Sequence, residues 1–299
     1  MKNYKIKSNW TSWPIYNLPE KRAVNRVINS NQLFAEKEVR NFEKEFELYN
    51  GSKNVYCVGN ATQGLHLALA ALNIGVGDEV IVTNYSWISS ASCILMQNAV
   101  PVFCDIEEET LGIDPNKIIS KITKRTKAIL YVHMFGNPAK VNQIYSIAKK
   151  YNLLIIEDAS HAHGATYKDI KVGNFSDVAV FSLHQRKNLS CGEGGIVISK
   201  KKSVSQKIYK LRSFGAKELS YNYRMTELQG AVGIAQLDKF NQIFRKHQKN
   251  RKLIINKLKK FKKIKFRKLP ENSSDAPESL IFSFDDKKLA KKFRESLFR

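Results

Sequence analysis

Residues 181–195 read Phe181-Ser-Leu-His-Gln-Arg-Lys-Asn-Leu-Ser-Cys-Gly-Glu-Gly-Gly195. The stretch joins two apolar runs, 177–183 and Ile196-Val-Ile-Ser199, which predict two strands of a buried sheet. Lys187 therefore lies on the turn between them, beside glycines that allow the backbone to approach closely. On these residues alone, the simpler interpretation is a surface lysine whose stem carries its ammonium out to solvent. The other interpretation is a lysine with a chemical role near the sheet.

A second apolar run lies upstream and ends in an acid. Leu153-Leu-Ile-Ile-Glu-Asp-Ala-Ser-His161 begins with four apolar residues, which is typical of a parallel strand buried on both faces. Asp158 follows at its carboxyl end, where open α/β sheets bind ligands. A pyridoxal phosphate (PLP) site needs a lysine that can attack a carbonyl and an acid that keeps the pyridine nitrogen protonated. Lys187 and Asp158 supply both residue types.

Together these two stretches resemble the sugar aminotransferases of the DegT/DnrJ/StrS type, and the match extends from about Ser30 to about Lys239. The pattern is Phe-Ser-x-x-x-x-Lys-Asn-Leu-x-x-Gly-Glu-Gly-Gly, with Glu-Asp-Ala-x-His-Ala-His-Gly-Ala upstream. The resemblance implies a PLP-dependent transferase of fold type I, an α/β protein with a mostly parallel, seven-stranded sheet flanked by helices. It also implies enzymes that act on nucleotide-linked ketosugars.

The composition of the chain limits the class of protein to which it can belong. The chain has 299 residues, of which 43% are hydrophobic and 26% charged, enough for one large and one small globular domain. No run reaches the ~18 apolar residues of a membrane helix, and no signal peptide is visible at the N-terminus. Four scattered cysteines without a CxxC pair argue against a disulfide framework or a metal cluster and favour a reducing, cytoplasmic location. They are Cys57, Cys93, Cys104 and Cys191.

The net charge of +23 is concentrated near the C-terminus. Residues 239–299 hold 20 Lys and Arg against 6 Asp and Glu. Such a segment could attract nucleic acid, an anionic membrane or phosphorylated substrates. We favour a solvated helix face, because the lysines alternate with Leu253, Ile254, Leu258 and Phe261 at helical spacing. We therefore expect no nucleic-acid partner and no membrane.

Strand and helix patterns alternate along the chain, which predicts a parallel sheet with helices on both faces. We expect an irregular N-terminal arm (1–20), a large PLP-binding domain (21–238) and a small C-terminal domain (239–299). The expected strands are 54–58, 79–82, 99–103, 128–132, 153–156, 177–183 and 196–199. The expected helices are 20–29, 36–49, 63–72, 88–96, 141–150, 203–214, one long helix from Thr226 to about Lys260, and 287–298.

The resemblance also assigns the residues that hold the cofactor phosphate. Ala61 and Thr62 open a helix, whose free N–H groups and dipole favour an anion, and Ser182 and the partner subunit's Asn222 complete the set. The family usually has Asn-Gly-Thr-Ala-Ala-Leu where this chain has Asn60-Ala-Thr-Gln-Gly-Leu65, so the turn lacks its most flexible residue. From the residues alone, Thr62 and Asn222 are ordinary helix caps and Ser182 is a strand serine.

Two rings are assigned to the cofactor by the same resemblance. Trp87 follows a strand and would stack on the pyridine ring, which adds about 0.5–1.5 kcal/mol beyond burial. His161 would touch the ring or its 3-oxygen. The alternatives are a core tryptophan and a satisfied core histidine. His133, in His133-Met-Phe-Gly136, is interpreted as a structural histidine at the end of a strand.

The predicted reaction transfers an amino group from L-glutamate or L-glutamine to a ketone of a nucleotide-linked sugar, within a homodimer that shares its active sites. Lys187 would hold the cofactor as a Schiff base and then move the proton, and Asp158 would keep the ring nitrogen protonated. One alternative is a PLP-dependent sugar dehydratase of the same family, but those proteins have histidine in place of the lysine, and His184 is out of register. The others are a non-catalytic PLP-binding or regulatory relative and a basic nucleic-acid binder.

The C-terminal segment carries one further expectation. Relatives of this type usually continue for several dozen residues past the point matching 284–299. The helix expected at 287–298 places Leu289, Phe293 and Leu297 at four-residue spacing, an apolar stripe that needs a covering surface. We therefore expect an incomplete small domain.

Overall fold

The computed structural model describes residues 13–34, 37–214 and 219–297, and its centre is a seven-stranded sheet in the order β1-β9-β8-β5-β4-β2-β3. The strands are β1 (Val55–Val58), β2 (Glu79–Thr83), β3 (Val100–Cys104), β4 (Thr126–Val132), β5 (Leu154–Asp158), β8 (Val178–Ser182) and β9 (Gly195–Ile198). Neighbours from β8 to β3 run parallel, whereas β9 is antiparallel to both β8 and β1. The expected mostly parallel sheet is confirmed, with its strands within a few residues of their predicted bounds.

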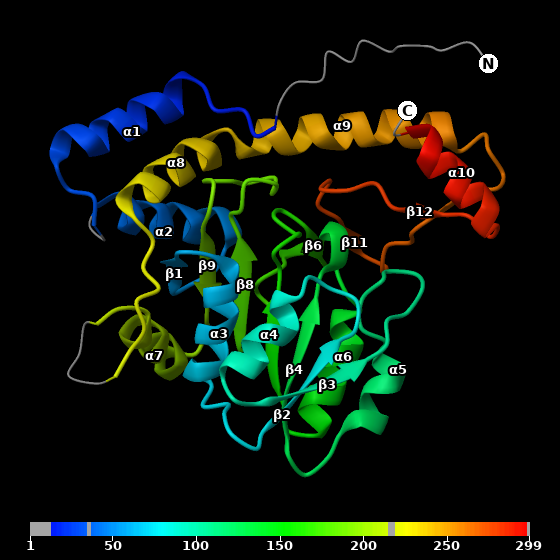
Figure 1. Ribbon diagram of the computed structural model, residues 1–299, viewed down its shortest axis with the longest axis horizontal. Helices are drawn as coiled ribbons and strands as arrows, with labels where there is room; N and C mark the ends of the chain where they lie inside the picture. Colours follow the sequence, from blue (N-terminus) through cyan, green and yellow to red (C-terminus); the bar gives the residue numbers. More distant parts are fainter. Residues whose placement is uncertain (1–12, 35–36, 215–218, 298–299) are drawn as a thin grey trace.

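Helices cover both faces of this sheet (Figure 1). They are α1 (Leu18–Ser30), α2 (Lys37–Asn50), α3 (Ala61–Ala71), α4 (Ser89–Met96), α5 (Pro115–Ile118), α6 (Val141–Lys150), α7 (Lys202–Arg212), α8 (Glu227–Asp238), α9 (Phe240–Leu258) and α10 (Lys287–Leu297), with short 3-10 helices η1 (Ile119–Lys121) and η2 (Met134–Gly136). Strand side chains point alternately to the two faces. Val80 and Val82 pack in one core with α3 and α4, and Ile81 packs in another with α5 and α6.

The N-terminal arm is partly helical, which corrects the expectation for residues 1–20. Helix α1 begins at Leu18, and residues 1–12 lie outside the described residues. The carboxylate of Glu20 accepts a hydrogen bond of 2.9 Å from the backbone N–H of Asn17. This contact satisfies a donor that the first turn of a helix leaves free, so the helix starts earlier than the apolar pattern indicates.

The helix expected from Thr226 to about Lys260 is in fact two helices, α8 and α9, which follow one another across the top of Figure 1. The break is at Lys239, whose φ of −101° and ψ of 2° leave the helical region. Its ammonium donates to the carbonyl of Ile15 at 2.9 Å and pairs with Glu20. The single-helix prediction was wrong because periodicity does not register a tertiary contact with the N-terminal segment.

Helix α9 carries much of the basic charge on a surface open to solvent. Its buried residue is Phe240, at its start, whereas Leu253 and Ile254 are about half exposed. A solvated helix face, as expected, is what the structure shows. Within the described part of the chain, no helix combines the length and apolar character needed to cross a bilayer.

After α9 the chain forms short strands and a last helix. The short strands are β6 (Thr166–Tyr167), β7 (Ile170–Lys171), β10 (Lys265–Phe266), β11 (Ser273–Ser274) and β12 (Phe282–Ser283), with β10 paired to β12 and β11 paired to β6. In α10, Phe293 packs on Phe282 and Phe284, but Leu297 leaves 68% of its surface exposed. The expected apolar stripe is therefore only partly covered. Phe298, its predicted end, lies outside the described residues.

Candidate active site

Lys187 lies on the loop between β8 and β9, and the loop is tied down by its own backbone. Its N–H donates to the carbonyl of His184 at 2.8 Å, and its carbonyl accepts a bond of 3.3 Å from Nε1 of Trp13 in the N-terminal arm. The Lys187 side chain is 14% exposed, and its Nζ lies 3.2 Å from Oε1 of Glu278. The ammonium is therefore turned inward and does not reach out to solvent.

Asp158 is the last residue of β5 and is held from two sides. Its Oδ2 accepts a bond of 3.0 Å from the Ser90 hydroxyl of α4, and its Oδ1 accepts the N–H of Ser160 at 3.1 Å. The residue is only 4% exposed. A buried carboxylate with two fixed donors keeps its orientation, which suits an acid that must face a ring nitrogen.

His161 lies beside this pair and is neutral. Its Nδ1 accepts the N–H of Phe135 at 3.1 Å, so in the neutral ring the proton sits on Nε2. Burial, with the nearby positive charge of Lys187, lowers the pKa of His161 to about 4, against a smaller opposing effect of Asp158. The approach of 3.6 Å between Nδ1 and Oε2 of Glu278 is therefore not an ion pair. His161 can present an N–H donor to a ligand.

Two of the four residues expected at the phosphate lie at the start of α3. Asn60 caps this helix by accepting the N–H of Gln63 at 2.9 Å, and the Thr62 hydroxyl lies 2.8 Å from that of Ser89, which precedes Ser90 on α4. Ala61 is the first residue of the helix. Gly195 of β9 is needed here, because a Cβ would lie 2.7 Å from the backbone carbon of Asn60.

Ser182, Trp87 and Asn222 complete the predicted set. Ser182 ends β8, is buried, and accepts the N–H of His184 at 3.3 Å. Trp87 leaves 72% of its surface exposed, so it is not a core tryptophan in the single chain. Asn222 is exposed as well. Both exposed side chains are open to a ligand or a second subunit, and their roles stay predictions.

Three residues of the site, Ser90, Glu278 and Arg267, were not predicted from the sequence. Ser90 had a weak signal, since serines follow the β2 strand at the start of a helix. Glu278 and Arg267 had none, because they lie in an irregular segment far along the chain. Arg267 donates to the carbonyls of Met134 and Phe135 at 2.5 and 3.1 Å, and burial lowers its pKa to about 10.

His133 has the structural role that was expected. It is fully buried, its Nδ1 accepts the N–H of Ala139 at 3.0 Å, and its Nε2 lies 2.8 Å from Oε1 of Glu157. In the same turn, Gly136 has a φ of +81°, and a Cβ there would lie 2.5 Å from the carbonyl oxygen of Ala276. This glycine allows the C-terminal segment to dock on the carboxyl edge of the sheet.

The donor set fits PLP. The end of β5 supplies the fixed carboxylate of Asp158, and the loop after β8 supplies the inward-facing amine of Lys187. The N-terminus of α3 supplies backbone N–H groups and the Thr62 hydroxyl, which suit an anion. When bound, PLP supplies the electron sink that stabilises negative charge on the donor carbon. No cluster of three or more His, Cys, Asp or Glu side chains among the described residues could hold a metal ion.

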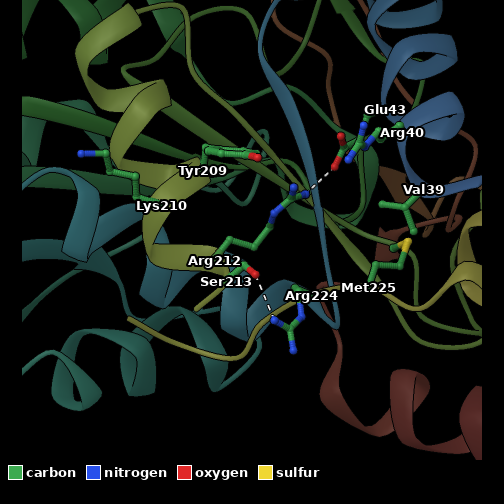
Figure 2. A pocket seen from close by; sticks show the side chains of 9 residues that line it. All are labelled: Val39, Arg40, Glu43, Tyr209, Lys210, Arg212, Ser213, Arg224 and Met225. Carbon is green, nitrogen blue, oxygen red and sulfur yellow. Dashed lines mark hydrogen bonds and ion pairs between the residues drawn. The ribbon is translucent and has the colours of Figure 1, made fainter. Parts of the chain in front are cut away.

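A separate hollow of about 120 Å³, seen in Figure 2, is lined by none of these residues. Its lining consists of Val39, Arg40, Glu43, Tyr209, Lys210, Arg212, Ser213, Arg224 and Met225. Arg212 binds both Glu43 and the carbonyl of Cys57, so it joins α7 to α2 and β1. Neither Lys187 nor Asp158 lines this hollow. Its residue Arg212 has a structural role, because its contacts hold three elements together.

Comparison with known families agrees with this geometry. The model of the DegT/DnrJ/EryC1/StrS aminotransferase family matches residues 16–297, and the chain belongs to this family. Its fold is accordingly that of PLP enzymes of fold type I. The recognition made from the two sequence stretches is confirmed.

Two curated relatives are each 40% identical to the chain. An uncharacterized protein of Methanocaldococcus jannaschii aligns over 72% of this chain and 60% of its own length, and GDP-perosamine synthase of Caulobacter vibrioides over 67% and 56%. The chain thus spans little more than half the length of these relatives. Among solved structures, an aminotransferase from Psychrobacter cryohalolentis matches with a TM-score of 0.88 and 33% identity, covering 93% of this chain and 79% of that one.

Proposed function

We propose that the chain is a PLP-dependent aminotransferase that moves an amino group from L-glutamate or L-glutamine to a keto group of a nucleotide-linked sugar, for amino-sugar biosynthesis. The observation that carries the proposal is the grouping of Lys187, Asp158 and His161 at the carboxyl edge of the sheet, where Lys187 and Asp158 both lie close enough to affect the pKa of His161. The similarity to a protein named GDP-perosamine synthase supports a nucleotide-linked sugar as the substrate class.

Each residue has a defined task in this proposal. Lys187 would hold the cofactor and, once released from it, would be the base that takes the proton from the donor carbon. Asp158 keeps the ring nitrogen protonated, and His161 donates its Nε2–H to the ring or its 3-oxygen. Ala61, Thr62 and Ser182 hold the phosphate at the start of α3, and Trp87 stacks on the ring.

The proposed active unit is a homodimer in which Asn222 reaches the phosphate of the neighbouring site. Its support is a set of large apolar side chains that the single chain leaves exposed, most of them on the segment 85–96 that carries Trp87. They are Phe34, Tyr85, Trp87, Ile88, Leu95 and Met96. A second subunit would cover this surface and bring Asn222 to the site.

The test combines trapping with turnover. Borohydride should fix PLP to the peptide that contains Lys187, and the chain should release 2-oxoglutarate from glutamate when given a GDP-linked ketosugar. Lys187→Ala should lose trapping at that peptide. Asp158→Asn keeps the shape but loses the charge, so turnover should fall by at least about a hundredfold. Trapping at another lysine would overturn the assignment, and trapping without turnover on any nucleotide-linked ketosugar would favour a non-catalytic relative.

A further inference from the structure

Glu278 faces the lysine from a part of the chain that the proposed chemistry does not use. Its Oε1 lies 3.2 Å from Nζ of Lys187, and its side chain is 11% exposed. Its Oε2 is buried and has no hydrogen-bond partner in the described part of the chain. A buried carboxylate with one oxygen unpaired lowers the stability of the fold, so the ammonium of Lys187 is needed to stabilise Glu278 in this position.

The position of Glu278 is set by tethers on the segment that precedes it. The N–H of Ala276 donates to the carbonyl of Gly136 at 2.9 Å, in the turn that follows β4. The guanidinium of Arg251, on α9, makes a two-pronged contact with Asp275. These contacts anchor the residues that precede Glu278, and they therefore place its side chain beside Lys187.

The groups around the carboxylate explain its charge state. Lys187 and Arg267 are positive, Asp158 is negative, and His161 is neutral. Burial raises the pKa of Glu278 to about 7, and the positive charges of Lys187 and Arg267 oppose this rise. The carboxylate therefore exchanges its proton near neutral pH, whereas an exposed glutamate does so well below it.

We propose that Glu278 is the positioning residue and counter-ion of Lys187, which it holds in place until a carbonyl compound arrives. The proposal rests on the carbonyl chemistry proposed above for this lysine. When the amine attacks, one proton passes from Nζ to the Glu278 carboxylate. The nitrogen lone pair then forms the bond to carbon, and the two remaining hydrogens leave with the carbonyl oxygen as water. The pair is neutral overall before and after the step, so no unpaired charge is left buried.

The experiment measures the reactivity of Lys187 without PLP. The full chain, free of cofactor, is labelled with acetic anhydride between pH 6 and 11, and acetylation of the Lys187 peptide is followed by mass spectrometry. Glu278→Gln keeps the shape but removes the charge that favours the ammonium. The midpoint of the Lys187 profile should move to lower pH, with labelling at pH 7 about tenfold faster. A mere opening of the site would raise the plateau at high pH without moving the midpoint.

The matched control is Glu193→Gln. Glu193 lies on the same loop, is 61% exposed and approaches His184. Its variant should label like the unsubstituted chain. An unmoved midpoint in Glu278→Gln, or an equal shift in Glu193→Gln, overturns the proposal. A separate incubation with PLP and borohydride tests the proposed function: no trapping at Lys187 in the unsubstituted chain would refute that function while leaving the acetylation result interpretable.

Discussion

The Ser90 hydroxyl donates its single proton to Oδ2 of Asp158 at 3.0 Å, so the orientation of this carboxylate is set from α4 as well as from its own strand. The Ser86 hydroxyl lies 2.8 Å from that of Ser90 and must donate to it, since the Ser90 proton is already engaged. Two serines and an aspartate thus form one directed chain of hydrogen bonds that ends at the proposed ring-nitrogen site.

The first prediction follows from this chain. Ser90→Ala removes one of the two fixed donors of Asp158 and leaves the Ser160 N–H in place. A hydrogen bond to a charged group contributes about 1.5–3 kcal/mol, so the affinity for PLP should fall about tenfold or more. The dissociation constant is measured by titration of the cofactor-free chain. Ser92→Ala, on the same helix, should bind as before, and equal affinity in both variants would remove the role given to Ser90.

The sequence predicted the strands and the residues Lys187 and Asp158 because these signals are local. Continuous apolar runs indicate buried parallel strands, and chemistry follows where such runs end. Glu278 could not be found in this way. It is brought to the lysine by long-range contacts, such as the hydrogen bond from the Ala276 N–H to the Gly136 carbonyl, that leave no periodic trace in the sequence. The break at Lys239 was missed for the same reason, since its partner lies near the other end of the chain.

The docking of the C-terminal segment depends on Gly136. Gly136→Ala would place a Cβ 2.5 Å from the Ala276 oxygen in a backbone with φ of +81°. Gly77 is a matched control, because its φ is +84° but a Cβ there would meet no atom within 4 Å. Gly77→Ala should cost about 1–2 kcal/mol of unfolding free energy from the backbone alone. Gly136→Ala should cost more by about 1–3 kcal/mol, because close packing is added to the same strain.

Urea unfolding of both variants measures this difference. The chain with Gly136→Ala should also show faster acetylation of Lys187, because a displaced segment carries Glu278 away from it. Equal losses of stability at the two glycines would mean that the segment docks without the close approach.

A buried carboxylate away from the site governs stability in acid. Glu157 accepts bonds from His133, the N–H groups of Gly173 and Phe175, and the Ser176 hydroxyl. Burial raises its pKa, but these donors together outweigh burial and hold the pKa below 4.5. Its contribution to stability is therefore fully present above about pH 4.5, where the unfolded chain is also ionised, and is lost as pH falls through the lower folded value.

Glu157→Gln should accordingly lower the unfolding free energy by about 3 kcal/mol at pH 7, because the amide turns an N–H toward groups that are themselves donors. The difference from the unsubstituted chain should shrink as the pH is lowered below 4.5. Thermal unfolding at several pH values measures it, with the exposed Glu108→Gln as the control that should change little. A difference that stays constant down to pH 3 would contradict the charge argument.

The last prediction concerns the proposed sharing of sites between subunits. Lys187→Ala removes the amine of a site, whereas Asn222→Ala removes a phosphate contact that belongs to the neighbouring site. In a heterodimer of the two variants, one site carries both lesions and the other carries neither. Purified heterodimers should therefore recover about half of the unsubstituted turnover, as a two-fold symmetric pair requires. Each variant alone is the control and should be nearly inactive. Absence of recovery in heterodimers verified by mass spectrometry would show that Asn222 serves the site of its own chain.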